Sequence, residues 1–130
     1  MTEPGPGFPQ NLNGAEILYR VLGKKKECRD HTFAFLIRES EKNSGLSVAY
    51  NCTPEEAEAP FNSWGILSLV AGDVSALGHP VVPDAPTHAN ITNIPYKEDN
   101  ETAAFHIAEN LSRICNPVVL RASEKKRQNP

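Results

Sequence analysis

The sequence lacks a hydrophobic run long enough to cross a bilayer, since a membrane-spanning helix takes roughly 20 consecutive apolar residues. Residues 1–10 have neither the basic start nor the apolar stretch of a secretory signal peptide. Cysteine is also scarce: Cys28, Cys52 and Cys115 leave one thiol unpaired in any pairing. We therefore expect a cytoplasmic protein with reduced thiols and no membrane association.

Basic side chains are too few for a typical nucleic-acid binder. The 130 residues include 13 Lys and Arg against 16 Asp and Glu, which gives a formal net charge of −3 at pH 7. A phosphate backbone is bound by clustered positive charge, so we expect no nucleic-acid partner. The hydrophobic fraction of 39% is enough for one modest core and too small for two domains.

Composition divides the chain into three parts. Residues 1–13 alternate Pro and Gly around Phe8 and cannot bury a face, which predicts a disordered arm. Residues 122–130 are short and charged, which predicts a flexible tail. Residues 14–121 between them carry the hydrophobic periodicity expected of one folded domain.

The order of the periodic segments predicts an α+β fold. Thr53 and Glu56 have the spacing of a capping box, which begins a short helix that Pro60 ends. The segment 101–115 is amphipathic at helical spacing, and we expect this helix to pack on one face of the sheet. The first strand candidate also fits a helical turn, and Val81-Val82 fits at best a short edge strand. The small mixed sheet is expected to contain 17–22, 32–37, 46–50, 64–70 and 88–94.

The sequence contains cysteines and histidines, which can bind a metal, but their spacing does not match that of a structural zinc site. Structural zinc sites combine two closely spaced ligand pairs, whereas Cys28 and His31 are the one such pair in this sequence. The remaining cysteines and histidines are scattered singly. Glycine-rich phosphate-binding loops between a strand and a helix are also missing. We therefore predict no metal site and no cofactor.

The segment 81–91 is the best candidate for a binding site. Pro83 and Pro86 within it, and Pro80 directly before it, restrict the backbone around Asp84 and His88, which lie four positions apart, and Asn90 adds an amide. Rigid polar loops of this kind frequently carry recognition residues. A structural role is the other interpretation, in which Asp84 begins an Asx turn and His88 binds a backbone carbonyl.

The same region carries a resemblance to a family of small uncharacterised bacterial proteins. The shared motifs, which span about residues 46–95, are LSV (46–48), TPEEA (53–57), WGILSL (64–69), LG (77–78), VVPD (81–84) and HANI (88–91). The family has Pro directly after the Asp, where this chain has Ala85 and then Pro86. The resemblance implies a bacterial cytosolic protein and supports Asp84 and His88 as positions of interest, without an activity to carry over.

A fainter similarity is to ADP-ribosyltransferase-like folds. Those begin with a strand that carries an aromatic and a basic residue, as Tyr19-Arg20 does here, followed by a strand and a helix resembling 46–59. The similarity implies that Arg20 binds a pyrophosphate and that His88 orients a ribose. The acidic residue that completes such a site has no counterpart in this chain.

Two functional hypotheses follow. The sequence shows no complete set of residues for a nucleophile, a metal site or a phosphate-binding site. The first hypothesis is therefore a non-catalytic accessory or interaction module. It would bind a protein partner through its two ends, which carry Phe8 and Lys125-Lys126-Arg127. The alternative is an NAD-dependent ADP-ribosyltransferase-like or other small-ligand enzyme. Its candidate binding residues are Tyr19, Arg20, Asp84, His88 and Asn90.

Overall fold

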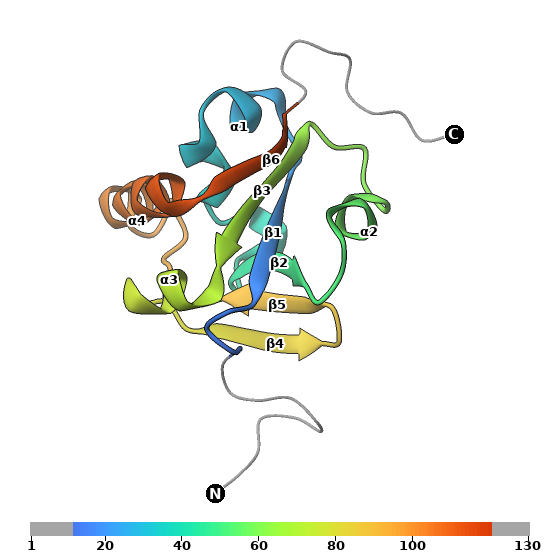
Figure 1. The fold of residues 1–130 in the computed structure, drawn as a ribbon. Coiled ribbons are helices and arrows are strands. Elements are labelled where there is room, and N and C mark those ends of the chain that lie inside the picture. Colours follow the sequence, from blue (N-terminus) through green and yellow to red (C-terminus); the bar gives the residue numbers. More distant parts are fainter. Residues whose placement is uncertain (1–11, 121–130) are drawn as a thin grey trace, which may run out of the picture.

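The computed structural model describes residues 12–120, drawn in colour in Figure 1. The predicted flexible tail of 122–130 and the predicted arm of 1–13, apart from its last two residues, lie outside the described residues. Leu12, where the described chain begins, donates its backbone N–H to the carbonyl oxygen of Val81 at 3.1 Å.

The centre of the fold is a six-stranded sheet with strand order β4-β5-β2-β1-β3-β6. Its strands are β1 Ile17–Leu22, β2 Leu46–Tyr50, β3 Gly65–Val70, β4 Val81–Ala85, β5 His88–Ile91 and β6 Asn116–Leu120. The predicted α+β class is confirmed, but the sheet is antiparallel in every recorded pairing rather than mixed. Parallel neighbours require a crossover that returns the chain to the same end of the sheet, whereas each neighbour here enters from the opposite end.

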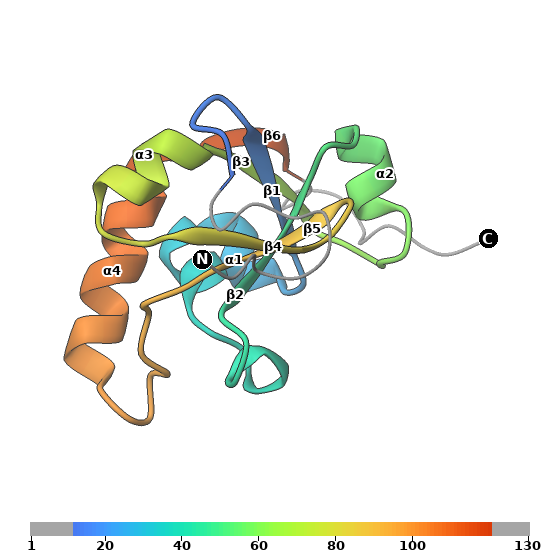
Figure 2. The same ribbon diagram turned by 90° about the horizontal axis from the view of Figure 1, so that it is seen from below.

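Short helices connect the strands, and one longer helix precedes the last strand. They are α1 Lys25–Arg29, η1 His31–Phe35, η2 Glu39–Glu41, α2 Pro54–Glu58, α3 Ala71–Ala76 and α4 Glu101–Ile114. Figures 1 and 2 show α4 and α2 on opposite sides of the sheet. The predicted capping box of α2 is confirmed, because Thr53 Oγ1 accepts from the Glu56 amide at 3.1 Å and Glu56 Oε1 accepts from the Thr53 amide at 2.8 Å.

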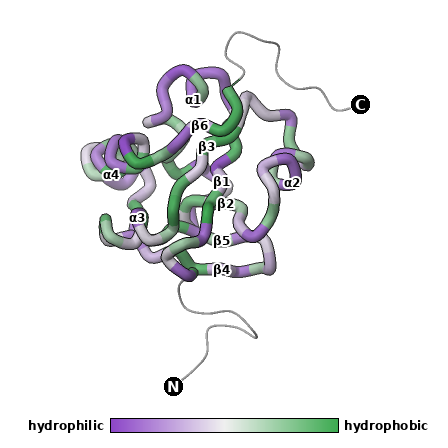
Figure 3. Tube along the Cα trace, in the orientation of Figure 1, coloured by the Kyte–Doolittle hydropathy of each residue, from purple (hydrophilic) through white to green (hydrophobic). Residues whose placement is uncertain are grey.

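The hydrophobic core lies on the α4 side of the sheet. Alternate residues of the strands point into the core. The apolar side of the amphipathic helix α4 completes the core, with Ala104, Ala108 and Leu111 buried and Ile107 partly buried. The strand residues in it include Leu18, Leu22, Leu46, Val48, Leu67 and Leu69. The hydrophobic colouring of β3 contrasts with the hydrophilic α1 in Figure 3. The helix packs chiefly against η1, and the Phe33 and Phe105 rings meet edge to face with centroids 6.3 Å apart.

The expected strand at 32–37 is wrong. Most of this segment belongs to η1, which follows α1 directly. Asp30 begins the turn by accepting a hydrogen bond from the Thr32 amide at 3.1 Å, and a turn then puts the consecutive residues Ala34 and Phe35 into the core. The local cap therefore favours a turn here over the extended strand that was expected.

The strand β6 was not expected from the sequence. After α4 ends at Ile114, the chain continues through Pro117 along the edge of the sheet next to β3. Proline is tolerated there because an edge strand leaves half of its amides unpaired in the ladder. Gly65 makes the pairing possible, since its φ is +142° and a Cβ atom there would lie 2.1 Å from the Val119 carbonyl oxygen.

Candidate active site

A row of polar side chains crosses the face of the sheet that points away from the core. Ser47 lies opposite Asn90, and the neighbouring pair is Ala49 opposite His88. The residues between them, such as Val48 and Ala89, point into the core, so strand alternation sends these four side chains to the other face.

The row forms a continuous chain of hydrogen bonds. Ser47 Oγ lies 2.5 Å from His88 Nε2, and His88 Nδ1 lies 2.5 Å from Asp84 Oδ1. The second oxygen of Asp84, Oδ2, accepts a hydrogen bond from Asn90 Nδ2 at 2.9 Å. Each group in this series of hydrogen bonds therefore orients the next one, from the amide of Asn90 to the hydroxyl of Ser47.

An irregularity in β4 positions Asp84. The register of β4 with β5 shifts between Pro83 and Ala85, and a bulge of this kind redirects a side chain at a sheet edge. Burial on its own would raise the pKa of the Asp84 carboxyl, but the hydrogen bonds from His88 and Asn90 outweigh it and hold that pKa below its usual value. Asp84 is therefore ionised beside His88 at neutral pH.

The arrangement fixes how His88 carries its protons. An ionised Asp84 is a hydrogen-bond acceptor, so it favours the tautomer with a proton on Nδ1. The free electron pair on Nε2 then faces the hydroxyl of Ser47. A hydroxyl, an imidazole that accepts its proton and a carboxylate that orients the imidazole are the parts of an activated serine nucleophile.

Two cavities meet at Ser47 and His88. The first has a volume of about 350 Å³ and lies between β1, β2 and α2; we call it the β1–α2 cavity. The second has a volume of about 300 Å³ and extends over β2, β4 and β5; we call it the β4–β5 cavity. Both cavities are lined by Ser47, His88, Arg38 and Phe61. A molecule bound across the boundary would place its middle at the serine hydroxyl.

A buried ion pair holds the backbone of Ser47. The register of β1 with β2 runs from Leu18 to Tyr19, and Arg20, the next residue of β1, donates from Nη1 to the Ser47 carbonyl oxygen at 2.8 Å. Glu41 Oε2 accepts from the Ser47 amide at 3.0 Å and from Arg20 Nη1 at 2.5 Å. The side chains of Arg20 and Glu41 therefore bond to the backbone of Ser47 where β1 and β2 separate and no longer pair with each other.

Arg38 is fixed beside the same site. Its backbone amide donates to Glu41 Oε1 at 2.8 Å, and its Nη2 donates to the Val21 carbonyl oxygen at 2.9 Å and to Glu27 Oε1 at 3.0 Å. Its side chain remains 37% exposed. The guanidinium thus has a defined position in the walls of both cavities while it stays in contact with solvent.

The structure brings together three of the residues singled out in the sequence, Asp84, His88 and Asn90. Tyr19 lies farther along the face and lines the β1–α2 cavity. Arg20 lines that cavity too, but its side chain is 1% exposed and its donors are engaged by Glu41, Ser47 and the Ala34 carbonyl oxygen. It faces the core rather than the mouth of a cleft.

Sequence reasoning missed Ser47. The alternation of residues 46–50 places this side chain on the polar face of its strand, which was the available signal. Nothing in the spacing says that β2 lies next to β5, so the contact between Ser47 and His88 across 41 positions was not visible.

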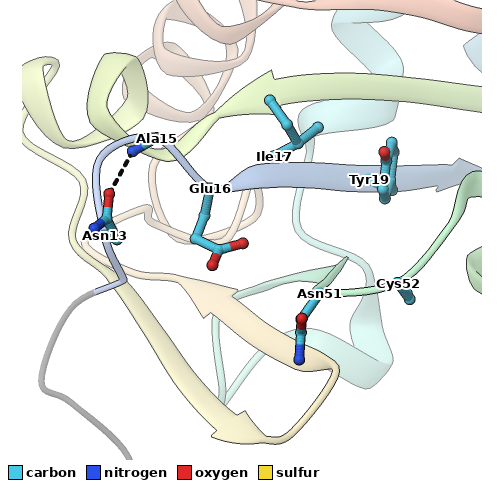
Figure 4. A pocket seen from close by; sticks show the side chains of 7 residues that line it. All are labelled: Asn13, Ala15, Glu16, Ile17, Tyr19, Asn51 and Cys52. Atoms are coloured by element: carbon cyan, nitrogen blue, oxygen red, sulfur yellow. Dashed lines mark hydrogen bonds between the residues drawn. The ribbon is translucent and has the colours of Figure 1, made fainter.

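A third cavity, of about 470 Å³, lies at the start of β1 (Figure 4). It shares Tyr19 with the β1–α2 cavity and is lined by Glu16, Asn51 and Cys52. Burial, with a smaller contribution from Glu56, raises the pKa of the Cys52 thiol, so Cys52 is not an activated thiolate. The cavity does not include Ser47 or His88.

The cysteine and histidine pair noted in the sequence does not face one common point. Cys28 is buried, whereas His31 Nδ1 lies 3.9 Å from Cys115 Sγ. Within residues 12–120, no group of three or more His, Cys, Asp or Glu side chains is placed to hold a metal ion. Among the helices in this range, none combines the length and apolar character needed to cross a membrane.

Comparisons with protein-family models, with curated proteins and with solved structures found no match to this chain. The resemblance to the family of small bacterial proteins and the similarity to ADP-ribosyltransferase-like folds therefore stay predictions. Function has to be argued from the chemistry of the site, because a fold alone does not determine it.

Proposed function

We propose that the protein is a serine hydrolase in which Ser47 is the nucleophile, His88 the general base and Asp84 the residue that orients His88. The observation that carries the proposal is the 2.5 Å separation of Ser47 Oγ and His88 Nε2 at the boundary of two cavities. This distance is within hydrogen-bond reach, as proton transfer from nucleophile to base requires.

The first half-reaction is acyl transfer to the serine. Ser47 Oγ forms a bond to the carbonyl carbon of an ester as its proton moves to His88 Nε2. The bond from that carbon to the alcohol oxygen then breaks, and His88 returns the proton to the departing alcohol. In the second half-reaction, water attacks the acyl group with His88 as base, and the released Ser47 oxygen regains its proton.

Arg38 is the group that we assign to the negative oxygen of the tetrahedral intermediate. It lines both cavities beside Ser47, and its contacts with Val21 and Glu27 limit its freedom to move. A donor that is held in position before the reaction stabilises a developing oxyanion with little reorganisation.

Hydrolysis of p-nitrophenyl acetate by the full chain tests the proposal. We expect turnover by the wild type and a decrease of at least about a hundredfold in kcat/KM for Ser47→Ala and for His88→Gln. Ser68→Ala is the matched control, because Ser68 lies on β3 and bonds to the Asn116 carbonyl oxygen. No turnover, or equal loss in the control, would overturn the proposal.

The competing proposal is the non-catalytic interaction module predicted from the sequence, with its protein partner. It would be favoured if purified wild-type protein hydrolysed no ester and retained a stoichiometric protein companion. The NAD-dependent alternative receives less support, since the Arg20 guanidinium is bonded to Glu41 and buried. A pyrophosphate would have to displace this ion pair to reach it.

A further inference from the structure

The two cavities that meet at Ser47 differ in chemical character. On the β1–α2 side, Val21, Ala49 and Ala57 join Tyr19 in a lining dominated by carbon. On the β4–β5 side, polar and apolar surface contribute about equally, and the polar share comes from hydroxyl, carboxylate and amide groups of Ser40, Glu41, Ser44, Asp84 and Asn90. The nucleophile therefore lies between an apolar cavity and a more polar one.

From this contrast we infer that the substrate is an ester of an apolar acyl group with a polar, hydroxylated alcohol, an inference that rests on the proposed hydrolase activity. The acyl chain occupies the β1–α2 cavity, where it loses contact with water. The alcohol occupies the β4–β5 cavity, where its hydroxyl groups replace water as hydrogen-bond partners of the lining.

The residues that orient His88 agree with this assignment. The departing alcohol receives its proton from His88, which lines both cavities. Of the two cavities, Asp84 and Asn90 line the β4–β5 cavity, which is the more polar one. The alcohol therefore finds its hydrogen-bond partners on that side, while the acyl group remains bonded to Ser47 and extends toward β1.

Phe61 completes the apolar side of the site. It lines both cavities, and the residue is 52% exposed although it is large and hydrophobic. It follows α2 in the chain, after the buried Ala57. A bound acyl chain would cover part of this exposed ring, which adds apolar contact on binding.

The first arm of the test varies the acyl chain. We expect kcat/KM to rise from p-nitrophenyl acetate to the butyrate by up to about fourfold for each added methylene, the value for complete burial. Ala49→Val narrows the β1–α2 cavity with a residue suited to a strand and should reduce this increase. Val21→Ala widens the same cavity and should favour octanoate. Ser44→Ala, in the other cavity, should leave the chain-length preference unchanged.

The second arm varies the alcohol at a constant acyl group. We expect monobutyrylglycerol to be hydrolysed at least about tenfold faster than butyl butyrate, and Ser40→Leu to reduce that ratio. A flat chain-length profile, or a preference for the apolar alcohol, would overturn this inference while hydrolysis itself still supported the nucleophile. Absence of all ester hydrolysis would instead overturn the proposed function.

Discussion

Ser47 Oγ lies 2.5 Å from His88 Nε2 although the two residues are 41 positions apart in the chain. The contact exists because β2 and β5 are neighbours in the sheet and because both side chains point away from the core. Antiparallel neighbours bring diagonally placed residues on one face within reach of long side chains. The geometry of the candidate nucleophile therefore follows from the strand order of the sheet.

Asp84→Asn is expected to reduce kcat without unfolding the protein. The substitution replaces the acceptor of the His88 Nδ1 proton by an amide that can donate, which disfavours the tautomer needed at Nε2. The expected loss is roughly 100- to 10,000-fold in kcat, with little change in KM or melting temperature. Steady-state kinetics and circular dichroism would measure both effects.

The control for this prediction is Asp73→Asn, an acid in α3 that lies outside the site. It should retain wild-type kcat. A wild-type kcat for Asp84→Asn would show that the carboxylate does not orient His88.

Glu41→Gln is expected to destabilise the fold strongly. Glu41 is 6% exposed and accepts from the side chain of Arg20 and from the amides of Arg38 and Ser47. Loss of its charge leaves the buried Arg20 without a counter-ion, which typically costs about 3–5 kcal/mol. Urea unfolding would measure this cost, and Glu55→Gln in the exposed first turn of α2 should change the free energy of unfolding by less than about 1 kcal/mol.

Acid should destabilise the protein through the same carboxylate. Burial alone would raise the pKa of Glu41, but the hydrogen bonds and charge of Arg20 outweigh it and lower that pKa in the folded state. The resulting stability is fully present above the unfolded value of about 4.3 and is lost as pH falls through the lower folded value. Thermal unfolding from pH 6 to pH 3 would show a decrease concentrated below about pH 4. An unchanged melting temperature over that range would contradict the ion pair.

Leu111→Asp is expected to unfold the domain or nearly so. Leu111 is fully buried in the stripe of α4 that completes the core, and an unpaired carboxylate there cannot be solvated. His106→Asp, on the exposed side of the same helix, should keep a melting temperature within a few degrees of the wild type. Equal melting temperatures for Leu111→Asp and the wild type would show that α4 is packed differently.

Local sequence patterns predicted most of the helices and strands but not which of them lie next to each other in the fold. The capping box at Thr53, the alternation of 46–50 and the stripe of α4 are short-range features that depend on nearby residues. The failure at η1 has a local cause, because Asp30 caps a turn within the segment. The failure at β6 has a long-range cause, because that strand depends on the close approach that Gly65 allows to Val119.

The candidate site was predictable in part for the same reason. Asp84, His88 and Asn90 belong to one hairpin, so their spacing already places them close together. Ser47 comes from another strand, and the pair of Arg20 and Glu41 that holds it joins two further segments. Such a constellation depends on tertiary contacts that the spacing of residues does not encode.

Covalent labelling of the full chain with diisopropyl fluorophosphate, read by intact mass and peptide sequencing, tests the nucleophile most directly. This reagent phosphorylates a serine only when its hydroxyl is activated by a base. We predict one adduct for each chain, on Ser47, and loss of that adduct in His88→Gln while Ser68→Ala still reacts. An unlabelled wild type, or an adduct on another residue, would contradict the assignment of Ser47 as the nucleophile.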